Sequence, residues 1–291
     1  MDKNKKRKKL AKPGSRGWLA GRSPTQIICV SFVLLIALGT LLLTTPMASR
    51  QGRLSVVDAM FTATSATCVT GLIVRDTWTQ FTVFGQAVIL LLIQVGGLGL
   101  VTLTSFFALA TRRRMGFRDL RLLGESVSAD GYAQAKDVLK IVVGLAALFE
   151  GIGVLLLLFA FVPQYGLEGI WVSVFTAISA FCNAGFDLFG RFGQYSSLVP
   201  YVHNYYVQFV IMLLIITGGL GFMVWVEIGQ YHKKHKLSLH AKVVLSFSVI
   251  LWVGGAVLLG LMEWNNPASM GGLSVPDKIC LLYTSPSPRD R

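Results

Sequence analysis

The chain has 291 residues, of which 53% are hydrophobic and only 14% are charged, and its mean hydropathy is +0.61. Soluble domains carry about 25% charged residues, so this composition argues against a soluble domain and favours a membrane protein. The net charge of +13 would suggest nucleic acid in a soluble protein, but the placement of the charges favours a membrane, and we expect no nucleic-acid partner.

A basic arm precedes the first apolar run. Residues 1–24 contain nine Lys or Arg residues and a single acidic residue, Asp2. The run from Ile27 to Thr45 is uncharged and long enough to cross a bilayer core of about 30 Å. It lacks the cleavage site of a secretory signal, so we interpret it as a spanning helix and the arm as its cytoplasmic anchor.

Spanning runs, re-entrant segments and a basic linker follow one another along the rest of the chain. In order, they are a first re-entrant segment (46–80), an uncharged run (Phe81–Ala110), a basic linker (111–140), a spanning run (Ile141–Val162), a second re-entrant segment (163–204) and two spanning runs (Tyr205–Tyr231 and Ala241–Met262). Lys and Arg number nine, seven and four in the three segments assigned to the inside, against three, one and three outside. This bias predicts a multi-pass protein of the cytoplasmic membrane with its N-terminus inside.

The two re-entrant segments contain the same eleven-residue motif. Phe61–Gly71 and Phe175–Gly185 lie 114 positions apart and share seven residues, and a glycine-rich motif follows each copy, at Val95–Gly99 and Thr217–Gly221. About 12 residues of helix rise only about 18 Å, which is too little to cross a bilayer. The repeat therefore predicts two half-helices, each followed by a glycine turn, as in a pore loop.

These paired motifs resemble the Ktr/Trk/HKT family of potassium-uptake proteins, and in particular its bacterial Ktr-type membrane subunit. The resemblance rests on four stretches: Thr62–Leu72, Gln94–Gly99, Ser179–Phe186 and Gly218–Phe222. It implies an all-α membrane protein in which helix–pore loop–helix units surround a cation path, with two units complete and a third begun. The implied parts are a basic cytoplasmic arm (1–24), a first unit (25–110), a cytoplasmic linker (111–140), a second unit (141–232), the start of a third unit (233–279) and an adapter-derived tail (280–291).

A potassium ion that crosses a membrane must exchange its water shell for protein oxygens, and backbone carbonyls can supply them. Carbonyls line a path only where the backbone leaves the helix, which glycine permits. The implied selectivity filter consists of Thr67, Cys68, Val69, Thr70 and Gly71 in the first unit and Phe181, Cys182, Asn183, Ala184 and Gly185 in the second. A glycine at position 71, rather than a serine, is the family feature that accompanies potassium preference.

Other candidate residues lie outside the two motifs. An ionisable group inside a spanning helix is a functional candidate, so Glu150 belongs either to the ion path or to a hydrogen bond with a neighbouring helix. The same two alternatives, ion path or helix packing, stay open for six glycines: Gly96, Gly97, Gly99, Gly218, Gly219 and Gly221. We expect no catalytic residue, no bound cofactor and no metal-ligand cage, because the four cysteines show no metal-binding spacing.

The resemblance implies potassium uptake, with K⁺ as the transported ion and Na⁺ as a candidate modulator. It also implies a homodimer in the lipid bilayer and a cytoplasmic nucleotide-binding regulatory ring, which would meet the basic segments Arg112–Arg121 and Lys233–Lys236. The alternatives are a Na⁺- or H⁺-coupled cation symporter, and a nonconducting membrane scaffold in this truncated form. A membrane enzyme that uses Glu150, Glu227 and the histidines is a further alternative, although no nucleophile–base spacing supports it.

The end of the chain differs in character from the rest. Residues 280–291 resemble a reading frame through a common sequencing adapter rather than protein-coding sequence. The stretch Pro267–Ile279 resembles the approach to a third pore helix, whose filter does not follow. We therefore expect the native protein to continue beyond Ile279 through two further pore segments, each ending in glycine.

Overall fold

The computed structural model describes residues 24–99, 132–234, 237–266, 271–272, 274–275 and 277–278. Within these ranges the regular secondary structure is helical apart from one isolated antiparallel bridge between Ser49 and Phe81, which agrees with the predicted all-α class. The predictions for the basic arm, for most of the 111–140 linker and for the 280–291 tail fall outside the described residues.

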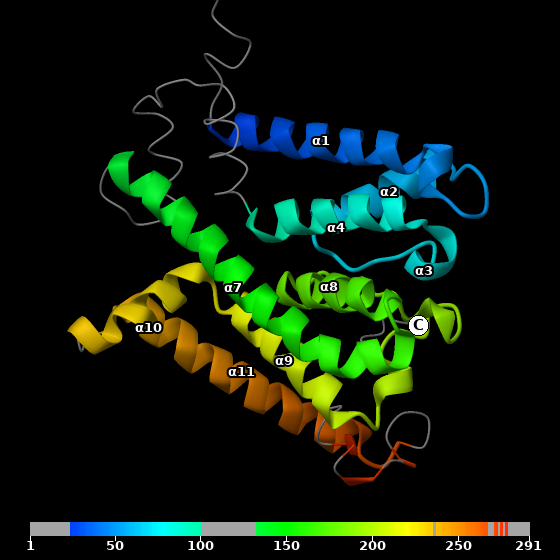
Figure 1. Ribbon diagram of the computed structural model, residues 1–291. Coiled ribbons are helices and arrows are strands. Elements are labelled where there is room, and N and C mark those ends of the chain that lie inside the picture. Colours follow the sequence, from blue (N-terminus) through cyan, green and yellow to red (C-terminus); the bar gives the residue numbers. More distant parts are fainter. Residues whose placement is uncertain are drawn as a thin grey trace, which may run out of the picture.

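Two groups of helices have the same internal arrangement (Figure 1). The first group consists of α1 (Pro24–Leu43), the short η1 (Pro46–Ala48), α2 (Val56–Thr67), α3 (Thr77–Gln80) and α4 (Val83–Gly97). The second consists of α7 (Tyr132–Tyr165), α8 (Glu168–Phe181), the short η2 (Phe189–Arg191) and η3 (Val199–Tyr201), and α9 (Tyr205–Gly219). In each group the short middle helix, α2 or α8, packs against the long helices on both sides of it in sequence.

Local sequence signals explain where these helices begin and end. The side chain of Ser55 caps α2 by accepting a hydrogen bond from the Asp58 amide at 3.0 Å. Thr82 caps α4 and Asn204 caps α9 in the same way. Helix α7 ends at Tyr165. Gly166 follows it with a left-handed φ of +59°, and its amide donates to the Val162 carbonyl.

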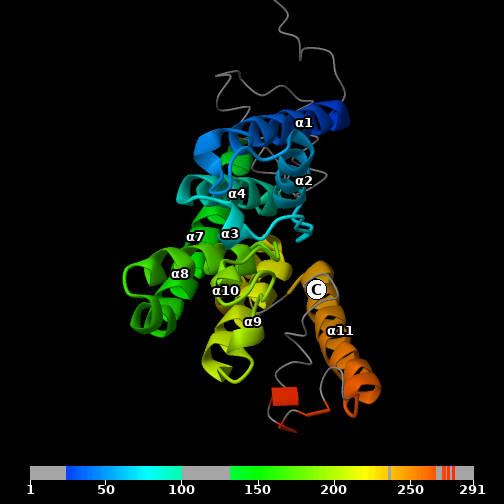
Figure 2. The same ribbon diagram turned by 90° about the vertical axis from the view of Figure 1, so that its right-hand side faces the viewer.

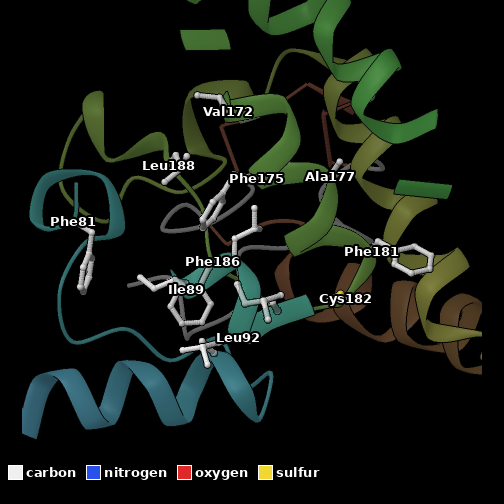
Figure 3. Packing of buried hydrophobic residues seen from close by; sticks show 14 of the residues in the cluster. Phe81, Ile89, Leu92, Val172, Phe175, Ala177, Phe181, Cys182, Phe186 and Leu188 are labelled. Atoms are coloured by element: carbon white, nitrogen blue, oxygen red, sulfur yellow. The ribbon is translucent and has the colours of Figure 1, made fainter. Parts of the chain in front are cut away.

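The hydrophobic core is shared by the two groups. Ile89 and Leu92 of α4 point toward Phe175 of α8 and toward Phe186 in the segment after it (Figure 3). All four side chains are at most 5% exposed. A hydrogen bond of 2.7 Å from the indole of Trp171 to the buried side-chain oxygen of Gln86 also joins α8 to α4. Burial of these apolar side chains therefore fixes the two groups as one body.

Two helices in the described part of the chain are long and apolar enough to cross a membrane. They are the Lys140–Tyr165 part of α7 and the whole of α11 (Leu239–Glu263). Figure 2 shows that α11 stands apart from the core, and its apolar surface is exposed. These helices cover the predicted spans Ile141–Val162 and Ala241–Met262, and α1 covers most of the predicted first span.

The predicted spanning run from Tyr205 to Tyr231 is bent rather than straight. The chain forms two helices there, α9 and α10 (Phe222–Lys234), which meet at an angle of 97°. Gly221 lies between them with a φ of +82°, a conformation that ends an α-helix and that glycine adopts readily. The indole of Trp225 donates to the Thr217 carbonyl at 2.8 Å and bridges the bend.

The uncharged run Phe81–Ala110 also does not form a single helix. Helix α4 ends at Gly97, well before the predicted end of the run at Ala110, and Gly99 follows with a φ of +72°. Its 15 residues rise about 22 Å, less than the thickness of a bilayer core. The remainder of the run, residues 100–110, lies outside the described residues.

Candidate functional site

The two copies of the repeated motif end their helices in the same way. Cys68 and Cys182 are the C-terminal caps of α2 and α8, and both have right-handed backbone angles. The Cys68 amide donates to the Thr64 carbonyl at 2.8 Å, and the Cys182 amide donates to its equivalent, Ile178, at 2.9 Å. The repeat in sequence is therefore a repeat in backbone geometry up to the last helical hydrogen bond.

Beyond the caps, both segments leave the helix through left-handed residues. Val69 and Asn183 have φ angles of +55° and +56°, and Gly71 and Gly185 have φ angles of +72° and +70°. Asparagine and glycine tolerate this conformation, whereas a β-branched valine rarely adopts it. A valine held in this conformation indicates that the surrounding structure imposes the path of the segment.

A serine in each of the helices α2 and α8 makes hydrogen bonds to the segment that follows the helix. The carbonyl of Ser65 accepts a hydrogen bond from the Thr70 amide at 3.0 Å, and the two hydroxyls lie 2.9 Å apart. The carbonyl of Ser179 accepts from the Ala184 amide at 2.8 Å, and its hydroxyl bonds to both backbone groups of Phe186. Sequence reasoning did not assign these serines to the site, although their identity in both copies of the motif was a signal that could have found them.

The two segments meet at their glycines. A Cβ placed on Gly71 would lie 2.9 Å from the carbonyl oxygen of Ala184 and 3.4 Å from the Cα of Gly185. A Cβ on Gly185 would lie 3.2 Å from the Cα of Gly71. The structure thus brings together the ends of two segments that lie 114 positions apart, and a glycine on each side allows the close contact.

Glycines of α4 and α9 pack closely against the C-terminal ends of α2 and α8. A Cβ on Gly96 would lie 2.0 Å from the carbonyl oxygen of Thr67. In the second unit, a Cβ on Gly218 would lie 1.7 Å from the carbonyl oxygen of Phe181, which is the equivalent contact. Neither position can hold a side chain without a shift of backbone, so these two glycines allow the helices to approach closely.

The remaining glycines have different surroundings. A Cβ on Gly97 would lie 2.6 Å from the Sγ atom of Cys182, so this glycine packs against the neighbouring unit. Gly219 is looser, with its nearest neighbour, the side-chain nitrogen of Asn183, at 4.0 Å. Gly99 and Gly221 would meet no atom within 4 Å, and the structure places them at helix ends with positive φ angles.

Glu150 lies at the contact between α7 and α4. Its side chain is buried, and the amide nitrogen of Gln94 donates to the two carboxylate oxygens at 2.8 and 3.1 Å. Gln94 is less than one helical turn from Gly97, which touches Cys182. The structure therefore places Glu150 in a hydrogen bond between α7 and α4.

Asp277 links the end of the described chain to the residues at the start of α9. Its carboxylate accepts hydrogen bonds from Ser274 at 2.6 Å and from Tyr205 at 2.8 Å, and the ring of His203 lies 3.2 Å away. The hydrogen bonds from Ser274 and Tyr205 hold the pKa of this carboxyl below its usual range. Ser274 and Asp277 have the same spacing as Ser55 and Asp58 at the start of α2.

The described residues contain no group of three or more His, Cys, Asp or Glu side chains that could hold a metal ion. The polar groups gathered where the two segments meet are backbone carbonyls and amides, hydroxyls and one asparagine amide. Such groups suit weak, exchangeable coordination of a monovalent cation better than tight binding of a transition metal.

Comparisons with known proteins show which family the chain resembles. Residues 8–265 match the TrkH family model, which is described as a cation transport protein. The chain is 37% identical over 269 residues to the potassium/sodium uptake protein NtpJ of Enterococcus hirae, covering 92% of the chain and 58% of that protein. It is also 37% identical over 262 residues to the Ktr system potassium uptake protein B of Bacillus subtilis, covering 90% of the chain and 58% of that protein. The protein of the same name from Vibrio alginolyticus is 37% identical over 264 residues, with 90% and 56% covered. The chain thus spans little more than half the length of these relatives.

Proposed function

The chain belongs to the TrkH family of cation transport proteins, and from this membership we propose that it forms part of a potassium-uptake pathway across the cytoplasmic membrane. The predicted family resemblance and the predicted class, a membrane protein of cation transport, are confirmed by the match. The family is one of transporters, so the alternative of a membrane enzyme loses its support. K⁺ is the proposed transported ion, and Na⁺ the proposed competitor.

The observation that carries this proposal is the meeting of two equivalent non-helical segments at Gly71 and Gly185. Backbone that leaves the helix inside a membrane is tolerated where it is buried in protein or lines a water-filled path. Each segment also follows the C-terminal end of a pore helix, whose partial negative charge attracts a cation. We infer that residues 67–71 and 181–185 form two sides of a selectivity filter.

Two sides do not enclose an ion. The relatives are longer than this chain, and we propose that two further pore segments complete the ring in the full-length protein. The proposed organisation keeps the predicted parts: a cytoplasmic arm, two complete helix–pore loop–helix units, a linker between them and the start of a third unit. The fragment alone would then be nonconducting.

The proposed partners are a second copy of the protein and a cytoplasmic nucleotide-binding ring. Two of the relatives are named as parts of a Ktr system, which supports a multi-component assembly. The ring would meet the basic segments Arg112–Arg121 and Lys233–Lys236, because the positive-inside bias places both on the cytoplasmic side.

Potassium uptake in a bacterial strain that lacks its own uptake systems tests this proposal. The full-length gene product should restore growth at low K⁺, and excess Na⁺ should inhibit uptake only weakly, because a carbonyl filter selects the larger ion. The 291-residue chain should restore nothing. Uptake that disappears when the Na⁺ or H⁺ gradient is abolished at constant membrane potential would favour the coupled symporter instead. A full-length protein that reaches the membrane and moves no K⁺ would contradict the proposal.

A further inference from the structure

The segment that follows Gly71 is held by the second unit rather than by secondary structure of its own. Residues 72–76 form no helix or strand. Tyr195, in the loop that follows the second pore segment, contacts this stretch at two points. Its hydroxyl donates to the Val74 carbonyl at 3.1 Å, and its backbone amide donates to the carboxylate of Asp76, also at 3.1 Å.

Asp76 is the centre of this contact. Its side chain is buried, and its other carboxylate oxygen accepts a hydrogen bond of 2.8 Å from the Thr79 amide, which caps α3. Gly190 of η2 lies directly against the carboxylate, since a Cβ on this glycine would lie 2.1 Å from one carboxylate oxygen and 2.3 Å from the other. The amide of Tyr195 and the backbone of Gly190, both in the second unit, therefore contact the buried carboxylate of Asp76 in the first unit.

The loop of the second unit is itself strained and anchored. Tyr195 has a φ of +62°, which a residue with a Cβ rarely adopts and keeps only where its surroundings impose it. Nearby, the guanidinium of Arg191 lies over the rings of Tyr165 and Trp78, at 4.5 and 5.4 Å from their centres. Because Trp78 belongs to α3 of the first unit, its cation–π contact with Arg191 joins the two units a second time.

We propose that Asp76 is a positioning residue for the filter, an inference that rests on the proposed function. Only four residues separate Asp76 from Gly71. The loop that Asp76 contacts begins at Phe189, four residues after Gly185. The buried carboxylate accepts hydrogen bonds from backbone amides of both groups of helices, so the contact fixes the two filter segments relative to each other from the outer side. Without it, the backbone contact between Gly71 and Gly185 loses its external support.

Asp76→Asn in the full-length protein tests this inference. Asparagine caps a helix as well as aspartate does, so the bond from Thr79 is kept. The amide nitrogen then faces the amide of Tyr195, and the bond between the units is lost. We expect Na⁺ to compete with K⁺ about tenfold better, as the loss of one charge-assisted hydrogen bond would allow, while uptake at saturating K⁺ stays within about twofold of the wild type.

The matched control is Glu168→Gln, the same chemical change in an exposed ion pair with Arg191 at 3.3 Å. Exposed pairs contribute little, so this variant should compete with Na⁺ as the wild type does. Equal Na⁺ competition in Asp76→Asn and the wild type would overturn the inference. So would an equal change in Glu168→Gln, because the effect would then not be specific to the buried carboxylate.

A second measurement separates this inference from the proposed function. Melting temperatures of the purified full-length protein should fall for Asp76→Asn and for Gly190→Ala, whose methyl group would meet the carboxylate. The double variant should lose no more than the worse single variant, because both changes break one contact. If the wild type shows no K⁺-selective uptake, the proposed function fails, and the melting temperatures alone test the contact between Asp76 and the loop of Tyr195 and Gly190. Additive losses of melting temperature in the double variant would contradict that contact.

Discussion

Gly71→Ser should let Na⁺ compete with K⁺ about tenfold better, which corresponds to a loss of about 1.4 kcal/mol of discrimination. The residue has a φ of +72°, and its Cβ would lie 2.9 Å from the carbonyl oxygen of Ala184. The serine side chain therefore both opposes the local backbone and pushes on the neighbouring segment. Since selection between the two ions depends on the spacing and number of carbonyl oxygens, a small shift here acts directly on selectivity.

The measurement is K⁺ uptake at increasing Na⁺ in a strain that lacks its own uptake systems, with protein levels measured in the same cells. Serine is small, so the protein should still accumulate in the membrane. Gly144→Ser is the control, because this exposed helical glycine has no atom within 4 Å of its Cβ position. Identical Na⁺ competition in Gly71→Ser and the wild type would show that the filter assignment is wrong.

Gly218→Ala should abolish uptake through loss of the folded protein rather than through loss of selectivity. Its methyl group would lie 1.7 Å from the carbonyl oxygen of Phe181, so α9 and the end of α8 would have to separate. Overpacking of a core costs about 1–3 kcal/mol, and a clash between backbone atoms that cannot rotate away should reach about 3 kcal/mol or more. We expect little full-length protein in the membrane and a clearly lower melting temperature in what remains.

The adjacent glycine provides the control for this second substitution. Gly219 lies in the same helix, and the nearest atom to its Cβ position is 4.0 Å away. Gly219→Ala should therefore accumulate and melt as the wild type does, or slightly higher, because alanine favours a helix. Normal accumulation and melting of Gly218→Ala, or equal losses in both variants, would contradict the close approach of α9 to the pore helix.

Much of the architecture could be predicted because the internal repeat carries its own signals. Residues that are identical in both copies, such as the serine at 65 and 179 and the glycine at 71 and 185, indicate two equivalent helices that end in the same way. The short length of both copies excluded a full span, because a bilayer core requires a longer helix. The positions of α1, α7 and α11 followed from long apolar runs with few charges.

Three features could not be predicted from these patterns. Hydropathy measures composition and not backbone conformation, so the break at Gly221 was missed inside an otherwise apolar run. The brace from Ser65 to Thr70 depends on how the chain turns back on its own helix. The contact between Asp76 and Tyr195 joins residues 119 positions apart, and only the packing of one unit on the other brings them together.

The central claim is that the segments 67–71 and 181–185 line one cation path. A structure of the full-length protein crystallised with Tl⁺, a K⁺ analogue located by its anomalous scattering, tests this claim most directly. We predict a Tl⁺ peak between the two segments, coordinated by backbone carbonyl oxygens of both, which weakens when K⁺ is added in excess. Tl⁺ bound elsewhere in a protein active in uptake, with no peak between Gly71 and Gly185, would contradict it.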